Sequence, residues 1–237
     1  MPVARLRPLS RHVAALDLHG RFQVATFLVR HRHGLALVDA GFPGWEHAIL
    51  TAARSLPPPN EITHVVLTHS HGDHVGAVAG VLAHMPAEVL CSERERPFVE
   101  GASLARSARG LGRRVALTLH ARLAGRGVAP VRVTRTLAEG ELVCGMRVVA
   151  VPGHTPGQIA LVHEADRLVL CGDALFHVRG RIGYDPIPGM TMDREAADAS
   201  LESIARLGIE DVAPSHGPAI LGDAPRRIEA FLRRSRR

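Results

Sequence analysis

The sequence contains no lysine, few aromatic residues and only three cysteines. Its 29 basic residues are therefore all arginine, and they outnumber the 23 acidic residues to give a net charge of +6 at neutral pH. Aromatic residues make up only 3% of the chain, too few for the stacking platforms of a nucleic-acid binder. We therefore expect no nucleic-acid partner.

The cysteines Cys91, Cys144 and Cys171 are an odd number and lack the paired spacing of metal ligands. This pattern indicates neither a disulfide framework nor a zinc ribbon. We expect all three to be small residues buried in the core.

Long hydrophobic runs are also absent. The longest, such as Val24–Val29, fall far short of the roughly 18 residues that cross a bilayer. Asp17 and Arg21 interrupt the N-terminal segment, which leaves no apolar core for a signal peptide. Hydrophobic residues at 46% and charged residues at 22% are typical of globular proteins. We expect a cytoplasmic protein without membrane contact.

Short apolar runs alternate with turns and helical patterns along the chain. Strands are expected at 22–29, 35–38, 62–67, 131–133, 146–151, 159–162, 168–171 and 212–213, and helices at 45–53, 75–82, 193–207 and 224–234. The segment 98–127 is rich in arginine, glycine and alanine, and we expect a helical insertion or lid there. No linker separates the two halves, so residues 1–237 are expected to form a single domain.

Three histidines and one aspartate lie within six positions directly after the expected strand 62–67; they are His69, His71, Asp73 and His74. Such side chains are costly to bury unless they are paired or bind a metal. Residues two apart in an extended loop point the same way, so His69 and His71 can hold one ion while Asp73 and His74 face a second.

Three later turns repeat the pattern of a strand that ends in a metal-ligand residue. His154, Asp173 and His216 each have a glycine as a direct neighbour, which lets the backbone approach an ion or a substrate closely. Imidazole nitrogen and carboxylate oxygen suit Zn²⁺, and Mn²⁺ or Fe²⁺ are also compatible.

Taken together, these residues resemble the motifs of the metallo-β-lactamase superfamily of hydrolases, from Asp39 to His216. The resemblance implies an α/β fold, a four-layer αβ/βα sandwich, with two zinc ions at one edge of its two central sheets. It implies that one ion is held by His69, His71 and His154, and the other by Asp73, His74 and His216, with Asp173 bridging both. Asp39 would accept a hydrogen bond from a ligand histidine and fix its tautomer.

The chemistry implied is hydrolysis by a metal-bridging hydroxide. Two ions that share a water lower its pKa from 15.7 toward about 7. The hydroxide would attack the carbonyl of an ester, lactone, thioester or related acyl bond in a small molecule. One ion would stabilise the oxyanion and the other would receive the leaving group. We assign catalytic roles to Asp173 as the bridge and to Asp73 as the proton carrier.

Within the superfamily, the chain is similar to the glyoxalase II and lactonase branches. Only 21 residues follow His216, so we do not expect the glutathione-binding helical region of glyoxalase II. Lactonases usually carry a tyrosine three positions after the bridging aspartate, where this chain has a phenylalanine. The expected substrate contacts are Phe176, His177, Arg179 and Tyr184. Antibiotic β-lactam hydrolysis is expected at most as a side activity.

The alternative from another reaction class is a mononuclear iron persulfide dioxygenase. Gly172-Asp173-Ala174-Leu175 followed by Arg179-Gly180 is mildly similar to that branch. Asp73, His74 and His216 remain to build a second metal site, which favours the hydrolase. The other histidines, among them His12, His31, His33, His64 and His163, match no motif and are expected not to bind metal. The oligomeric state stays open, a homodimer included.

Overall fold

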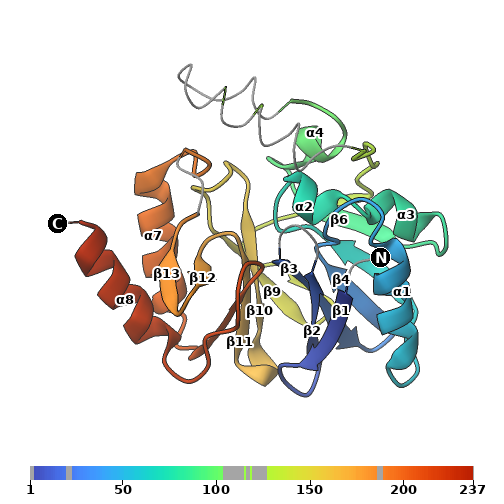
Figure 1. The fold of residues 1–237 in the computed structure, drawn as a ribbon, viewed down its shortest axis with the longest axis horizontal. Helices are drawn as coiled ribbons and strands as arrows, with labels where there is room; N and C mark the ends of the chain where they lie inside the picture. Colours follow the sequence, from blue (N-terminus) through green and yellow to red (C-terminus); the bar gives the residue numbers. More distant parts are fainter. Residues whose placement is uncertain are drawn as a thin grey trace.

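Two β-sheets face each other and carry helices on their outer faces (Figure 1). The computed structural model describes residues 3–19, 23–103, 115, 118, 127–185 and 189–236. The larger sheet contains, in spatial order, β1 (Val3–Pro8), β2 (Val13–His19), β3 (Gln23–His31), β4 (Gly34–Val38), β5 (Ile62–Val66), β6 (Glu88–Ser92) and β7 (Arg135–Leu137). Strands β1 to β4 pair antiparallel, whereas β4 to β7 pair parallel.

The smaller sheet contains, in spatial order, β14 (Asp211–Pro214), β11 (Leu168–Gly172), β10 (Ile159–His163), β9 (Met146–Ala150) and β8 (Leu142–Val143). Strand β14 is parallel to β11, and the other pairs are antiparallel. A separate hairpin is formed by β12 (Phe176–Val178) and β13 (Arg181–Gly183).

Helices cover the outer face of each sheet, at opposite ends of the view in Figure 1. On the side of the larger sheet lie α1 (Glu46–Ser55), α2 (Gly72–Val75), α3 (Val78–Leu82) and α4 (Arg96–Val99). The smaller sheet is covered by α7 (Arg194–Ala205) and α8 (Ala224–Ser235), and a short 3₁₀ helix, η1 (Glu164–Asp166), joins β10 to β11.

Three apolar clusters hold these layers together. Side chains on a strand alternate between its faces, and β3 shows the result: Phe27 and Val29 pack between the sheets, whereas Val24 and Leu28 pack under the helices of the larger sheet. The cluster between the sheets contains residues from both of them, including Leu161 of β10. A third cluster lies between the smaller sheet and α7 and α8. The layers therefore form the expected four-layer αβ/βα sandwich.

Most of the expected central strands and long helices are present, but several edge elements were not expected. Strands β1 and β2 were not predicted, because Arg5, Arg7 and Asp17 interrupt their apolar pattern. The strand expected at 131–133 is wrong, since the strand lies at β7 instead. The backbone N–H of Val131 donates to the Val99 carbonyl and that of Val133 to Glu100, so this segment pairs with a loop.

The single helix expected at 75–82 is wrong as well. The structure has two short helices, α2 and α3, on either side of Gly76 and Ala77. A Cβ at Gly76 would lie 2.5 Å from Pro43, so glycine permits close contact with that loop. Most of the lid expected at 98–127 lies outside the described residues. Among the described helices, none is long and apolar enough to cross a membrane.

Replacing Leu161 with alanine tests the packing between the sheets. Leu161 is fully buried in the cluster shared by both sheets, so we expect Leu161→Ala to lower the free energy of unfolding by about 2–5 kcal/mol. Leu221→Ala is the matched control, because Leu221 is 56% exposed and its loss should change stability by about 0.5 kcal/mol or less. Urea unfolding measures both, and equal effects would contradict the shared core.

Candidate metal centre

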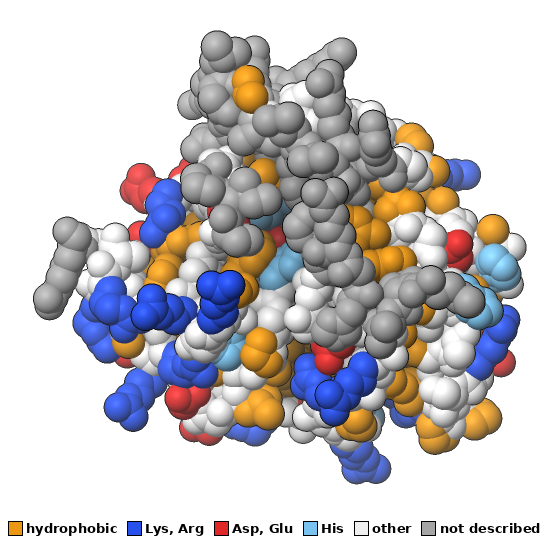
Figure 2. All heavy atoms as spheres, in the orientation of Figure 1, with side chains coloured by type: hydrophobic (Ala, Val, Ile, Leu, Met, Phe, Trp, Pro, Cys, Tyr) orange, Lys and Arg blue, Asp and Glu red, His pale blue; other side chains and the backbone are white. Residues whose placement is uncertain are grey.

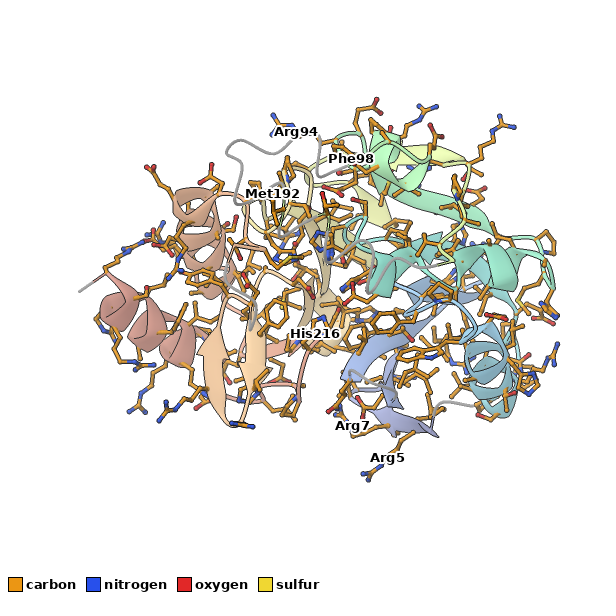
Figure 3. The ribbon with its side chains drawn as sticks, turned by 45° about the horizontal axis from the view of Figure 1, so that its top comes forward. Arg5, Arg7, Arg94, Phe98, Met192 and His216 are labelled. Atoms are coloured by element: carbon orange, nitrogen blue, oxygen red, sulfur yellow. The ribbon has the colours of Figure 1, made fainter. Side chains whose placement is uncertain are left out.

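Strand ends from both sheets deliver the candidate ligands to one edge of the sandwich. His69 and His71 follow β5, His154 follows β9, Asp173 follows β11 and His216 follows β14. Strands β9, β11 and β14 run in the same direction, because β9 and β11 are both antiparallel to β10 and β14 is parallel to β11. Figure 3 shows His216 between the two halves of the molecule, and Figure 2 shows histidine side chains at the centre of this face.

Three buried imidazoles converge in the first group. His71 Nδ1 lies 3.1 Å from His69 Nε2 and 3.0 Å from His154 Nε2. A neutral imidazole nitrogen has one lone pair or one proton, so a single Nδ1 cannot form good hydrogen bonds with both neighbours. His154 Nδ1 is buried without a hydrogen-bond partner among the described residues. The spacing and the donor set therefore fit ligands that share one cation.

The second group consists of Asp73, His74 and His216, whose ligand atoms all lie within 4.8 Å of one another. His216 Nε2 lies 3.4 Å from Asp73 Oδ2. Asp173 lies between the groups: its Oδ2 is 3.5 Å from His154 Nε2 and 3.4 Å from His216 Nε2, and its Oδ1 is 3.4 Å from His74 Nε2. One carboxylate thus contacts both groups.

The site concentrates negative charge in a buried place. Burial lowers the pKa of His216, but the Asp173 and Asp73 carboxylates outweigh it and raise that pKa to about 10. Burial likewise opposes ionisation of Asp173, yet His216 and His74 hold its pKa well below the usual range. Burial and then the charge of His74 lower the pKa of His69, which keeps its ring neutral and suited to bind a metal.

Hydrogen bonds behind the rings orient their Nε2 atoms inward. Asp39 Oδ2 lies 2.8 Å from His74 Nδ1 and accepts the Thr68 hydroxyl at 2.7 Å. That hydroxyl lies 3.1 Å from His69 Nδ1, and His216 Nδ1 lies 3.1 Å from the Gln23 carbonyl. Each of the three rings thus has an oxygen at Nδ1, which leaves Nε2 as the ligand atom.

Glu95 is a positioning residue that the sequence analysis missed. Its side chain is fully buried, and its carboxylate accepts the Ser70 N–H at 2.9 Å and the Gly157 N–H at 2.9 Å. Glu95 therefore ties the loop of His69 and His71 to the loop of His154. A carboxylate just beyond the buried strand β6 was the available signal, the same signal that drew attention to Asp39 after β4.

Glycines let two of these loops approach their neighbours closely. Gly172 has a φ of +53°, and a Cβ there would lie 2.6 Å from the Thr68 hydroxyl. Gly217 has a φ of +99°, and a Cβ there would lie 1.8 Å from the carbonyl oxygen of His177. The loops that carry Asp173 and His216 therefore need glycine at these positions.

Among the four expected substrate contacts, Phe176 lies against the site. Its ring stacks on His216 with centroids 4.7 Å apart. His177 instead contacts the Pro218 carbonyl at 2.7 Å and Arg227 at 2.9 Å. Tyr184 packs in the cluster under α7 and α8, where its hydroxyl donates to Asp198. Arg179 is exposed in the turn between β12 and β13, with a φ of +51°.

The family of the chain follows from a comparison with family models. Residues 19–216 match the model described as the metallo-beta-lactamase superfamily. The chain belongs to this superfamily, it is a metal-dependent hydrolase, and its fold implies a divalent metal site.

Proteins that align with most of this chain are named as hydrolases. The chain is 28% identical to the probable metallo-hydrolase YflN of Bacillus subtilis, over 94% of this chain and 92% of that protein. It is 33% identical to a hydroxyacylglutathione hydrolase of Anaeromyxobacter dehalogenans, over 81% of this chain and 60% of that protein.

Solved structures agree as well. The di-iron-bound form of TTHA1623 is 30% identical, with a TM-score of 0.68 over 90% of this chain and 97% of that chain. A beta-lactamase domain protein of Burkholderia ambifaria, 23% identical, superposes with a TM-score of 0.72 over 100% of this chain and 78% of that chain, which supports the fold.

Asp39→Asn tests the hydrogen bonds behind the rings. Asparagine tolerates the φ of +56° at this position, but it has only one acceptor oxygen for Thr68 and His74. We expect zinc affinity, measured by competition with a chromophoric chelator, to fall about 10–100-fold. Asp17→Asn is the control, because the Asp17 carboxylate pairs with Arg7. Unchanged zinc affinity in Asp39→Asn would contradict this role.

Proposed function

We propose that the protein is a binuclear metal-dependent hydrolase that cleaves an ester, lactone, thioester or related acyl bond of a small molecule. The observation that carries this proposal is the position of Asp173, whose two carboxylate oxygens contact both ligand groups. One group supplies His69, His71 and His154, and the other supplies Asp73, His74 and His216. A single ion would occupy only one of these two adjoining ligand groups.

The names of several relatives support this chemistry. The relatives include a hydroxyacylglutathione hydrolase and the thioesterase pkgB of Emericella nidulans, which is 25% identical over 96% of this chain and 54% of that protein. Both names describe hydrolysis at an acyl group. TTHA1623 was crystallised in a di-iron-bound form, which supports two ions and leaves zinc and iron as candidates.

Some residues of the site would bind metal ions or orient the ligands, and one would transfer a proton. When bound, divalent ions in such a site lower the pKa of a shared water to roughly 7 and so make hydroxide available at neutral pH. Asp39 and Thr68 keep His74 and His69 in the tautomers that bind through Nε2. Asp73 Oδ2, 3.4 Å from His216 Nε2, would carry a proton to the leaving group.

Phe176 would form an apolar wall for the substrate beside His216. Its ring is nearly parallel to the His216 ring, with 6° between their planes, and its side chain is buried. The contact fixes the orientation of both rings. An acyl chain or a lactone ring that packs against this wall would bring its carbonyl to the edge of the metal centre, so we propose Phe176 as a substrate contact.

Metal analysis and oxygen uptake separate the hydrolase from the iron dioxygenase. Protein purified without added metal should contain about two divalent ions per chain by plasma mass spectrometry. It should consume no oxygen with glutathione persulfide, and it should hydrolyse members of a panel of lactones, esters and thioesters. One iron per chain together with oxygen consumption would overturn the hydrolase in favour of the dioxygenase.

Asp173→Ala should abolish most hydrolysis while the fold survives. Residues behind metal ligands commonly contribute 10–100-fold, so we expect loss of a ligand shared by both groups to lower kcat/KM by at least about 100-fold. Glu229→Ala removes an exposed carboxylate of α8 and serves as the control. Circular dichroism reports the fold, and full activity in Asp173→Ala would exclude the binuclear mechanism.

Phe176→Tyr should raise lactone turnover if the pocket is lactonase-like. The new hydroxyl would extend from a ring already held against His216 and could donate to a substrate carbonyl. A single good hydrogen bond contributes about 0.5–1.5 kcal/mol, which predicts a gain of roughly 2–12-fold in kcat/KM. Phe231→Tyr, on α8, is the control. No change across several lactones would count against this placement of the substrate.

A further inference from the structure

A histidine-rich cavity of about 770 Å³ opens at the edge of the sandwich opposite the candidate metal centre. Its lining includes the end of β3, the start of β5, the turn between β8 and β9 and the end of β10. The candidate metal centre uses the other end of β5. His64 and His69 are therefore separated by roughly 15 Å of extended chain.

Three potential ligands from different parts of the chain meet in this cavity. His31 comes from β3, His64 from β5 and Cys144 from the turn between β8 and β9, and their ligand atoms all lie within 4.8 Å of one another. A tetrahedral zinc site with Zn–N near 2.0–2.1 Å and Zn–S near 2.3 Å requires ligand atoms about 3.3–3.8 Å apart. The ligand atoms lie within 4.8 Å of one another, so side-chain rotations would have to bring them to that spacing.

One hydroxyl orients both histidines. Thr63 Oγ1 lies 3.0 Å from His31 Nε2 and 2.8 Å from His64 Nδ1, and it donates to the Leu35 carbonyl at 3.4 Å. A hydroxyl that gives its proton to a carbonyl accepts an N–H from each ring. His64 Nε2 then carries a lone pair for a metal, while His31 Nδ1 accepts the His33 N–H at 3.4 Å, a long hydrogen bond that would have to give way to the metal.

Cys144 occupies a position at which cysteine is unfavourable for the backbone. Val143 pairs with Met146, so Cys144 and Gly145 form a two-residue hairpin loop, with φ values of +49° and +81°. Asparagine, aspartate and glycine are the residues that favour the first position of such a loop. The sequence analysis expected a buried core residue here, but Cys144 is only partly buried. Cys144 packs against the cluster between the sheets, and its strained backbone beside two histidines also fits a ligand role.

The neighbouring group in the same cavity has a carboxylate that is already engaged in hydrogen bonds. His12, His163 and Asp166 also lie close together. The Asp166 carboxylate, however, already accepts the His12 N–H at 2.8 Å and the Ser10 hydroxyl at 2.5 Å, and it lies 2.8 Å from His12 Nδ1. His163 Nδ1 in turn accepts the Asp166 N–H. This group forms a closed hydrogen-bond network that ties the β1–β2 turn to η1.

We propose that His31, His64 and Cys144 form a second, mononuclear Zn²⁺ site that links the two sheets at the edge opposite the candidate metal centre. Cys144 would bind as a thiolate, with its proton released to solvent, and a water in the cavity would complete the tetrahedron. His31 and His64 belong to the larger sheet and Cys144 to the smaller one, so the ion would cross-link the sandwich. The site lies outside the proposed hydrolytic chemistry.

Arg30 and Arg135, two of the three arginines that line the cavity, are engaged with other groups. Arg30 donates to the carbonyls of Pro57 and Pro59 at 2.8 and 3.1 Å, and Arg135 pairs with Glu141.

Cobalt substitution of the reduced, full-length protein tests the site. Co²⁺ bound to a thiolate gives a near-ultraviolet charge-transfer band, and the ligands proposed for the other centre are histidines and aspartates. We expect this band in the wild-type protein and in Asp173→Ala. Cys144→Asn should abolish the band and lose one bound Co²⁺ per chain. The asparagine suits the hairpin loop, so this variant should fold.

Removing either histidine should weaken the same site. His31→Gln and His64→Gln should each lower Co²⁺ affinity, read from the band, by at least about 10-fold. Cys91→Ala and His84→Gln are the controls and should keep the band, because Cys91 is buried in the core and His84 is exposed at the end of α3. Zn²⁺ should raise the melting temperature of Asp173→Ala, and this rise should be smaller when Cys144→Asn is added to it.

Two results would overturn the proposal. The first is the absence of the band in wild-type protein whose three thiols are shown to be reduced by titration after unfolding. The second is a band that persists in Cys144→Asn. A melting temperature of Asp173→Ala that does not respond to Zn²⁺ would exclude the cross-link between the sheets.

Discussion

Packing of the two sheets against each other determines which strand ends meet, and the candidate metal centre depends on that packing. Backbone hydrogen bonds join the sheets next to the ligands: the Ile159 N–H donates to the Thr68 carbonyl at 3.0 Å, and the Ala25 N–H donates to the Ser215 carbonyl at 2.8 Å. Thr68 and Ser215 directly precede His69 and His216. Hydrogen bonds to neighbouring backbone therefore fix the loops from which these ligands project. This explains how short loops can form a preorganised site.

The residues with the strongest chemical signal were predictable from the sequence. Histidines and aspartates at strand ends stand out because burying them is costly, and the structure brings all seven expected ligands into two adjoining groups. The central strands were also predictable, because they are continuous apolar runs. Strands β1 and β2 were not, since Arg7 and Asp17 pair with each other between these strands and conceal the strand pattern. Glu95 was missed because its partners are backbone N–H groups of distant loops, which no local motif records.

Contacts that local sequence does not record also explain why the expected substrate contacts do not all lie at the site. Phe176, His177 and Tyr184 are close in sequence, yet they face different partners, because the β12–β13 hairpin turns successive side chains to opposite faces. Phe176 packs on His216, whereas His177 points to Pro218 and Arg227. Their proximity to Asp173 in the sequence predicted that these residues border the candidate metal centre. The register of the hairpin, however, decides which side chain contacts that centre.

Hydrogen-bond satisfaction distinguishes a structural cluster of histidines from a ligand set in this protein. At one edge, the Asp166 carboxylate accepts the His12 N–H and lies 2.8 Å from His12 Nδ1, and His163 Nδ1 accepts the Asp166 N–H, so these contacts need no cation. At the other edge, His71 Nδ1 faces two imidazole nitrogens at once, an arrangement that protons alone cannot complete. Burial makes that mismatch costly, and a shared cation relieves it. In the His31 and His64 pair, Thr63 orients both rings, and His31 Nδ1 accepts the His33 N–H at 3.4 Å, a long contact that a cation would replace.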